Sequence, residues 1–127
     1  MAPKVKILVV DDESELTDLM HYHFRRAGHD VSTATNGWEA IHVVQANRPD
    51  LILLDLMLPD LDGFGVCEIL RRDPATATIP IIIVSAWVSN DSRSLGLELG
   101  ALDYITKPFR PQELVERVNH LLHARVG

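Results

Sequence analysis

The chain has 127 residues, a length that fits one domain able to bury a sizeable core without disulfides or metals. Its 18 acidic residues outnumber its 12 lysines and arginines, which disfavours direct binding to a nucleic-acid backbone. The single cysteine, Cys67, excludes an intrachain disulfide and fits the cytoplasm, and no apolar run nears the roughly 20 residues of a membrane helix. An acidic stretch at 11–13 follows the first apolar run, so we expect neither a signal peptide nor membrane association.

The first part of the chain predicts a strand, a helix, a second strand and a second helix. Residues 5–10 (VKILVV) are typical of a strand buried on both faces. The next stretch has apolar residues at helical spacing, and Gly28 predicts its end. These residues are Leu16, Leu19, Met20, Phe24 and Ala27. Residues 31–34 (VSTA) indicate a strand nearer a sheet edge. A second apolar stripe follows an entry at Asn36 or Gly37 and consists of Ala40, Ile41 and Val44.

The middle of the chain repeats this alternation. Residues 51–54 (LILL) predict another buried strand. Asp62 is a good N-cap for a third helix. The inward-facing residues of that helix are Val66, Cys67 and Leu70. Residues 81–84 (IIIV) then predict a fourth strand, again nearly all apolar.

The last part of the chain contains one poor helix and one good one. Residues 89–99 have a single thin apolar edge, formed by Leu95 and Leu99, and Gly96 inside the helix costs about 1 kcal/mol. Residues 102–105 (LDYI) predict an edge strand. The final apolar stripe is the most regular, with Pro111 near its first turn. It consists of Leu114, Val115, Val118, Leu121 and Leu122.

The alternation of short apolar strands and amphipathic helices predicts the α/β class. Parallel strands require right-handed crossovers, so helices cover both faces of a doubly wound sheet. Five such strands commonly take the order 2-1-3-4-5 of the flavodoxin-like fold. We expect residues 1–127 to form one domain of this kind.

Polar residues follow several of the predicted strands. Ligands of open α/β sheets bind beyond the carboxyl ends of the strands, where Asp11, Asp12, Asp55, Ser85 and Lys107 all fall. Strands one and three are neighbours in the expected order, so the three carboxylates should lie within a few ångströms of one another. Each residue taken alone is more simply a cap, turn or surface residue, but their coincidence at one edge indicates a site.

The chemistry of this cluster indicates phosphoryl transfer. Three carboxylates in one crevice repel one another unless a cation compensates, and all-oxygen ligands with open positions suit Mg²⁺. Lys107 supplies a point charge for a phosphate, and an aspartate can itself become an aspartyl phosphate. Mg²⁺ and lysine together offset the charge of a transferred phosphoryl group.

Four segments of the sequence resemble the receiver domain of two-component response regulators. They are ILVVDDE at 7–13, LILLDLMLPDLDGF at 51–64, PIIIVSA at 80–86 and GALDYITKPF at 100–109. The resemblance covers residues 4–124, and implies either a single-domain regulator of the chemotaxis type or a receiver cut from a longer regulator. The string GLELGALDYITKPF is similar to receivers attached to winged-helix DNA-binding domains.

The resemblance implies a role for each matching residue. Asp55 is the expected phosphoryl acceptor, and Asp11 and Asp12 are expected to bind Mg²⁺ together with Asp55 and the backbone carbonyl of Met57. Lys107 is expected to bind a phosphoryl oxygen, and the Lys107–Pro108 bond is expected to be cis. Ser85 corresponds to the switch hydroxyl and Tyr104 to the aromatic residue that moves with it.

Two large side chains are expected to tune the lifetime of the phosphoryl group. Met57 lies two residues beyond Asp55 and, in extended chain, points to the same side as Asp55; Trp87 lies two residues beyond Ser85 and is bulkier than the family usually has there. A thioether accepts hydrogen bonds weakly and an indole only donates them, so neither orients an attacking water well. We therefore expect slow hydrolysis.

The sequence predicts a cytoplasmic phosphoprotein that acts as a signalling switch rather than an enzyme. A sensor histidine kinase or phosphotransfer protein is the expected donor. The surface formed by 89–99, 102–105 and the last helix is expected to respond and to offer a possible homodimer contact.

Two other functions remain open from the sequence. A receiver-like binding module without phosphorylation is disfavoured by the intact acceptor, metal and lysine positions. A Mg²⁺-dependent phosphatase or phosphotransferase on a related fold would need a second acid after Asp55, where the +2 residue is Met57.

Overall fold

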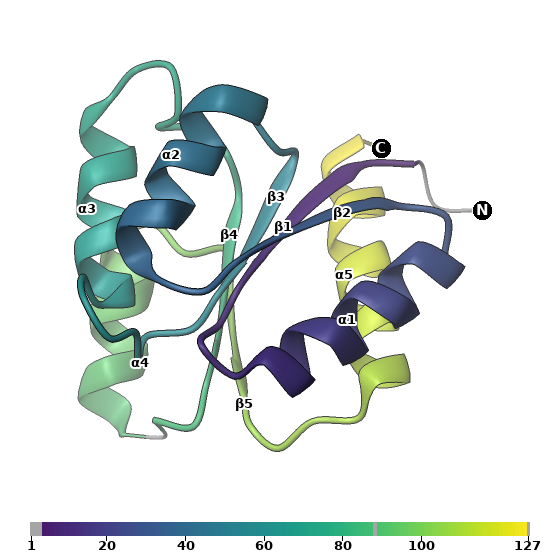
Figure 1. The fold of residues 1–127 in the computed structure, drawn as a ribbon. Coiled ribbons are helices and arrows are strands. Elements are labelled where there is room, and N and C mark those ends of the chain that lie inside the picture. Colours follow the sequence, from purple (N-terminus) through teal and green to yellow (C-terminus); the bar gives the residue numbers. More distant parts are fainter. Residues whose placement is uncertain (1–3, 88, 127) are drawn as a thin grey trace.

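Figure 1 shows the computed structural model, which describes residues 4–87 and 89–126. Strands and helices alternate along the chain, as the hydrophobic pattern predicts. The strands are β1 (Lys6–Val10), β2 (Asp30–Ala34), β3 (Leu51–Leu54), β4 (Ile81–Ser85) and β5 (Asp103–Thr106). The helices are α1 (Ser14–Arg26), α2 (Gly37–Asn47), α3 (Gly63–Arg72), α4 (Asn90–Glu98) and α5 (Pro111–Val126). Within the described residues, no helix has the length and apolar character needed to cross a membrane.

The five strands form one parallel sheet in the order β2-β1-β3-β4-β5, which confirms the predicted topology. The three most apolar strands, β1, β3 and β4, lie in the centre, and the two more polar strands lie at the edges. This arrangement follows from burial, because a central strand has helices on both of its faces and has no exposed side to carry polar residues.

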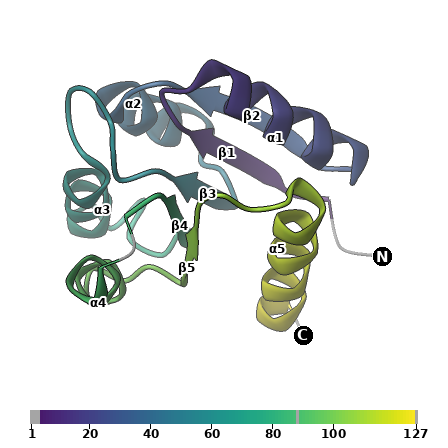
Figure 2. The same cartoon turned by 90° about the horizontal axis from the view of Figure 1, so that it is seen from below.

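Helices cover both faces of the sheet (Figures 1 and 2). Helices α2, α3 and α4 lie on one face, and α1 and α5 lie side by side on the other. Each face has its own apolar core, one containing Val44, Val66 and Leu70, the other containing Phe24 and Val118. The two layers leave the carboxyl ends of the strands accessible at one edge of the sheet.

Three helices begin at side-chain caps that fix the loops near that edge. The side chain of Asn36 accepts a hydrogen bond from the Glu39 N–H at 2.8 Å, which decides the entry of α2 in favour of Asn36 as N-cap. Asp62 accepts from the Gly65 N–H at 2.9 Å, as predicted for α3. Ser89 caps α4 in the same way. Each cap satisfies a backbone donor that the helix leaves unpaired.

The end of α1 differs in part from the prediction. Gly28 does terminate the helix, with a φ of 96° that suits glycine, and the helix itself ends at Arg26, so Ala27 is its C-cap rather than part of its apolar stripe. Leu19 was predicted to face the core but is 42% exposed. The turn of the helix places Met20 and Phe24 on the sheet, and Leu19 lies outside that stripe.

The predicted apolar edge of α4 is wrong in part: Leu99, at the end of the helix, packs against the core as expected, whereas Leu95 does not. Leu95 is 41% exposed, and the buried residue of the helix is Gly96. A side chain at Gly96 would place its Cβ 2.6 Å from the Ile83 Cδ1 atom. The glycine therefore lets the helix backbone approach β4 closely. This close approach explains why a glycine occupies this position although it lowers the stability of the helix itself.

Candidate functional site

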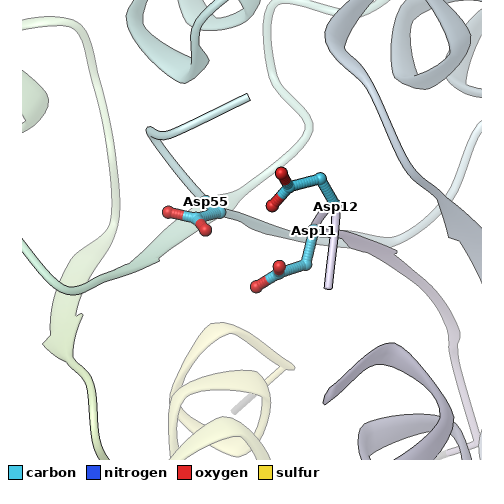
Figure 3. Close-up of side chains that lie close together, drawn as sticks. All are labelled: Asp11, Asp12 and Asp55. Atoms are coloured by element: carbon cyan, nitrogen blue, oxygen red, sulfur yellow. The ribbon is translucent and has the colours of Figure 1, made fainter. Parts of the chain in front are cut away.

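Two neighbouring strands bring the predicted acidic residues together. Val10 at the end of β1 pairs with Leu54 at the end of β3, so Asp11 and Asp55 follow at the same level of the sheet. The Asp55 N–H donates to the Val10 carbonyl at 3.0 Å, which continues the ladder one residue beyond the strand. Figure 3 shows the side chains of Asp11, Asp12 and Asp55 gathered at this point.

The three carboxylates form a cluster with the chemistry of a magnesium site. One oxygen from each of Asp11, Asp12 and Asp55 lies within 4.8 Å of the others. Asp11 and Asp55 are each only 3% exposed, whereas Asp12 is exposed. A cluster that combines two buried oxygen donors with one facing solvent suits a hard cation that keeps part of its water shell.

Lys107 reaches the same cluster from the end of β5. Its Nζ donates to Asp11 Oδ2 at 2.7 Å and to Asp55 Oδ2 at 2.9 Å, and it lies 3.7 Å from the exposed carboxylate of Glu13. The Lys107–Pro108 peptide bond is cis, as the family resemblance implied. The lysine therefore bridges the two buried carboxylates and offsets their repulsion.

The environment moves the protonation equilibria of this cluster in definite directions. Burial raises the pKa of Asp11, and the hydrogen bonds from Lys107 and the Glu13 N–H only partly oppose it. For Lys107, burial acts to lower the pKa, but the hydrogen bonds to Asp11 and Asp55 outweigh it and the pKa is raised. The lysine thus stays cationic, while Asp11 carries the cost of a buried negative charge.

The chain turns immediately after Asp55. The other carboxylate oxygen of Asp55, Oδ1, accepts the Met57 N–H at 3.1 Å, and the chain bends at Leu56, which is fully buried. The extended backbone assumed for this segment is therefore wrong, because the strand ends at Leu54 and the aspartate closes a local turn. Met57 itself is 48% exposed.

Ser85 and Tyr104 lie on the paired strands β4 and β5. Ser85 is the last residue of β4 rather than the residue after it, and its Oγ accepts the Trp87 N–H at 3.3 Å. Tyr104 is 4% exposed and its hydroxyl donates to the Trp87 carbonyl at 2.6 Å. The Trp87 ring packs on Phe64, with centroids 6.2 Å apart. Trp87 is thereby held through its backbone by Ser85 and Tyr104 and through its ring by Phe64.

Comparison with known proteins decides the family. Residues 7–119 match the family described as the response regulator receiver domain.

The chain belongs to the response regulator receiver family.

Its sequence relatives include the Bacillus subtilis alkaline phosphatase synthesis transcriptional regulatory protein PhoP, which is 48% identical over 117 residues, covering 92% of this chain and 48% of PhoP. The Synechocystis DNA-binding dual master transcriptional regulator RpaA is 43% identical over 117 residues, covering 92% of this chain and 48% of RpaA. The chain thus spans about half the length of these curated relatives. These two are transcriptional regulators rather than chemotaxis proteins.

Solved structures agree with this assignment. The receiver domain of the Francisella response regulator 1452 has a TM-score of 0.88 and 37% identity, covering 96% of this chain and 99% of that one. The BeF3-activated N-terminal receiver domain of Klebsiella pneumoniae RstA has a TM-score of 0.84 and 35% identity, covering 92% and 97%. The Vibrio cholerae chemotaxis protein CheY4 has a TM-score of 0.87 and 28% identity, covering 94% and 99%.

The receiver fold also contains site contacts that sequence reasoning missed. Asp60, in the loop after Asp55, accepts the N–H groups of Gly37 and Trp38 at 2.8 and 3.1 Å and so ties this loop to the start of α2. Glu13 stands near Lys107. The acidic run at 11–13 could have suggested Glu13, but the partner of Asp60 is distant in sequence and has no local signal.

Proposed function

We propose that this receiver domain is switched by phosphorylation of Asp55, with a histidine kinase or a phosphotransfer protein as the donor. The observation that supports this most directly is the position of Asp55. Its carboxylate is buried, shares Lys107 with Asp11, and clusters with Asp11 and Asp12 at the carboxyl edge of the sheet. Asp11 shares the lysine and the cluster, and the resemblance of residues 51–64 to the receiver family favours Asp55 as the acceptor.

The proposed reaction is a direct transfer from a phosphohistidine. A carboxylate oxygen of Asp55 attacks the phosphorus, a P–O bond forms as the P–N bond breaks, and the imidazole nitrogen of the donor leaves with the electron pair. Lys107 holds one carboxylate oxygen of Asp55 at 2.9 Å and is within reach of a phosphoryl oxygen bound there. Its fixed positive charge stabilises the charge of the transferred group without reorganisation.

The acidic cluster fits Mg²⁺ by its donor chemistry. Asp11, Asp12 and Asp55 would hold the ion, with the backbone carbonyl of Met57 as a further ligand. When bound, Mg²⁺ supplies positive charge that offsets the phosphoryl oxygens. Lys107 donates to Asp11 at 2.7 Å and to Asp55 at 2.9 Å, so it would share both carboxylates with the ion.

We further propose that Ser85 and Tyr104 transmit the change. Ser85 is fully buried at the end of β4, the strand next to β3, and we propose that its hydroxyl turns toward a phosphoryl group on Asp55. Tyr104 pairs with Ile83 on β4 and reaches the loop after Ser85 through its hydroxyl. Movement of Ser85 alters this loop, and with it the balance between buried and exposed positions of the Tyr104 ring.

Met57 and Trp87 are proposed to slow the loss of the phosphoryl group. Both are partly exposed, at 48% and 38%, and neither side chain orients water well. Met57→Asn with Trp87→Glu should accelerate hydrolysis, measured as decay of the phosphorylated protein in Mg²⁺ after donor removal. Equal or slower decay in the folded double variant would reject this proposal.

The output of the switch is proposed to be a protein contact made by α4, β5 and α5. Leu95 and Leu97 are exposed there, and Arg117 pairs with Asp103 across α5 and β5 at 2.7 Å. A second copy of the chain is one candidate partner. Because the relatives are transcriptional regulators of about twice this length, we propose transcription as the response that this domain controls.

Intact mass spectrometry tests the proposed function. A small acyl phosphate and Mg²⁺ should add one phosphoryl group to the native protein, and Asp55→Asn should gain none. Asp50→Asn serves as the control, because Asp50 is exposed at the opposite end of β3. Equal labelling of Asp55→Asn would contradict the assignment of Asp55.

A further inference from the structure

Helix α4 is weakly anchored to the rest of the domain. Among its residues Asn90–Glu98, only Gly96 is buried, and Leu95 and Leu97 are 41% and 49% exposed. A helix that buries so little apolar surface gains little from packing, so its position depends on a few specific contacts. Tyr104 on β5 provides several of them.

The ring of Tyr104 lies between the sheet and α4. A Cβ built on Gly96 would be 3.6 Å from the Tyr104 Cδ2 atom, so the ring packs against the helix backbone at this glycine. The hydroxyl end donates to the Trp87 carbonyl at 2.6 Å, in the loop that leads into the helix. One side chain therefore contacts both α4 and the loop before it.

Arg93 completes the enclosure of this ring. Its guanidinium carbon lies 5.1 Å from the centre of the Tyr104 ring, within the range of a cation–π contact. Arg93 and Gly96 are three residues apart, so they share one face of the helix. Within residues 4–87 and 89–126, no carboxylate lies at salt-bridge distance from Arg93.

We propose that Arg93 is a positioning residue of the switch, whose contact with the Tyr104 ring favours the buried position of that ring and ties α4 to β5. The proposal rests on the proposed function, because it assigns the Arg93 contact to the switch that Ser85 and Tyr104 form. It adds a determinant on α4 that acts before any phosphorylation. Movement of the Tyr104 ring between its buried and exposed positions is then coupled to movement of α4.

The size of the effect follows from the strength of the contact. An exposed cation–π pair changes an equilibrium constant by about two- to fivefold. Arg93→Gln should therefore raise the exposed fraction of the Tyr104 ring by about this factor. Arg93→Lys keeps the charge but loses the flat guanidinium. Its exposed fraction of the Tyr104 ring should lie between those of the native protein and Arg93→Gln.

Carbon-13 relaxation dispersion on ring-labelled tyrosine measures this fraction in the full chain. The chain has two tyrosines, and Tyr22 on α1 is 52% exposed and serves as an internal reference. Arg72→Gln is the matched control, because Arg72 is an exposed arginine on α3. Each protein is measured alone and with beryllofluoride and Mg²⁺, which should restore the buried ring in Arg93→Gln.

A second readout separates a specific contact from a general loosening of the helix. Burial raises the pKa of the Tyr104 phenol, and the charge of Arg93 opposes this rise. For the ring that stays buried, the phenol of Tyr104 should thus titrate at higher pH in Arg93→Gln than in the native protein, and it should not shift in Arg72→Gln. An unchanged exposed fraction in Arg93→Gln without beryllofluoride, or an equal change in Arg72→Gln, would overturn the proposal. If beryllofluoride and Mg²⁺ leave the exposed fraction of the Tyr104 ring unchanged in the native protein, this would instead count against the proposed function.

Discussion

Replacing Lys107 by methionine tests how much the lysine stabilises the fold by offsetting the charges of Asp11 and Asp55. Lys107 donates to Asp11 at 2.7 Å and to Asp55 at 2.9 Å, and both acids are 3% exposed. Methionine keeps most of the aliphatic length but leaves two buried carboxylates without their shared cation. Removing one partner of a buried ion pair typically costs roughly 3–5 kcal/mol.

The lower end of that range applies here, because the exposed Asp12 shows that the cluster opens to solvent. A loss of about 3 kcal/mol corresponds to a fall of roughly 10 °C in Tm for a domain of this size. Mg²⁺ should recover much of the loss, since it supplies the missing positive charge and binds only the folded protein.

The loss should also depend on pH. Burial raises the pKa of Asp11 above its ordinary value of 3.8, so its protonated form favours folding and its ionised form opposes it. The deficit of Lys107→Met should therefore be small below about pH 4 and should grow as pH rises toward 7. In the native protein the raised pKa of Lys107 keeps its contribution intact below its ordinary value of 10.5, and this contribution is lost as pH rises further.

Thermal and urea unfolding at pH 4 and pH 7.5, each with and without Mg²⁺, measures these effects. Lys4→Met is the control, because the Lys4 side chain is 69% exposed and lies 3.8 Å from Asp30. If Lys107→Met is as stable as Lys4→Met at pH 7.5 without Mg²⁺, or if Mg²⁺ restores nothing, the proposed balance of charges in this cluster is refuted.

Three further predictions concern single residues. Asp12→Ala should abolish the stabilisation by Mg²⁺ at little cost to the metal-free fold, because Asp12 is exposed; an unchanged shift in Tm would remove it from the site. Gly63→Ala should lower the free energy of unfolding by roughly 1–3 kcal/mol, since its Cβ would lie 2.5 Å from the Asp55 carbonyl oxygen and 2.8 Å from the Leu56 Cα; unchanged urea stability would contradict this. Burial raises the pKa of the Cys67 thiol to about 11. Its alkylation at pH 8 should be more than about 100-fold slower in the folded than in the unfolded protein, and comparable rates would contradict the burial.

The sheet and its polar edge could be predicted because both follow from local patterns. Apolar runs at 5–10, 51–54 and 81–84 identify the central strands, and the residues after parallel strands must share one edge. Asp11 and Asp55 meet for this reason, although they are 44 positions apart in the sequence. The positions of side chains that directly follow the strands could therefore be predicted from the sequence.

The details that escaped prediction depend on contacts between distant segments. Leu95 carries the apolar character in α4, yet Gly96 is buried, because close approach to Ile83 matters more than side-chain hydrophobicity there. The turn after Asp55 was missed because the carboxylate accepts a backbone N–H only once the strand has ended. Arg93 gave no signal at all, since its partner Tyr104 lies on another element.

Locating the phosphoryl group tests the central claim most directly. Borohydride reduces an aspartyl phosphate to homoserine, so the modified residue keeps a mass label that survives digestion. The protein should be phosphorylated with a histidine kinase or a small acyl phosphate in Mg²⁺, reduced, digested and sequenced by tandem mass spectrometry. We predict homoserine at position 55 alone. The label at Asp11, Asp12 or any other acid, with residue 55 unmodified, would contradict the account.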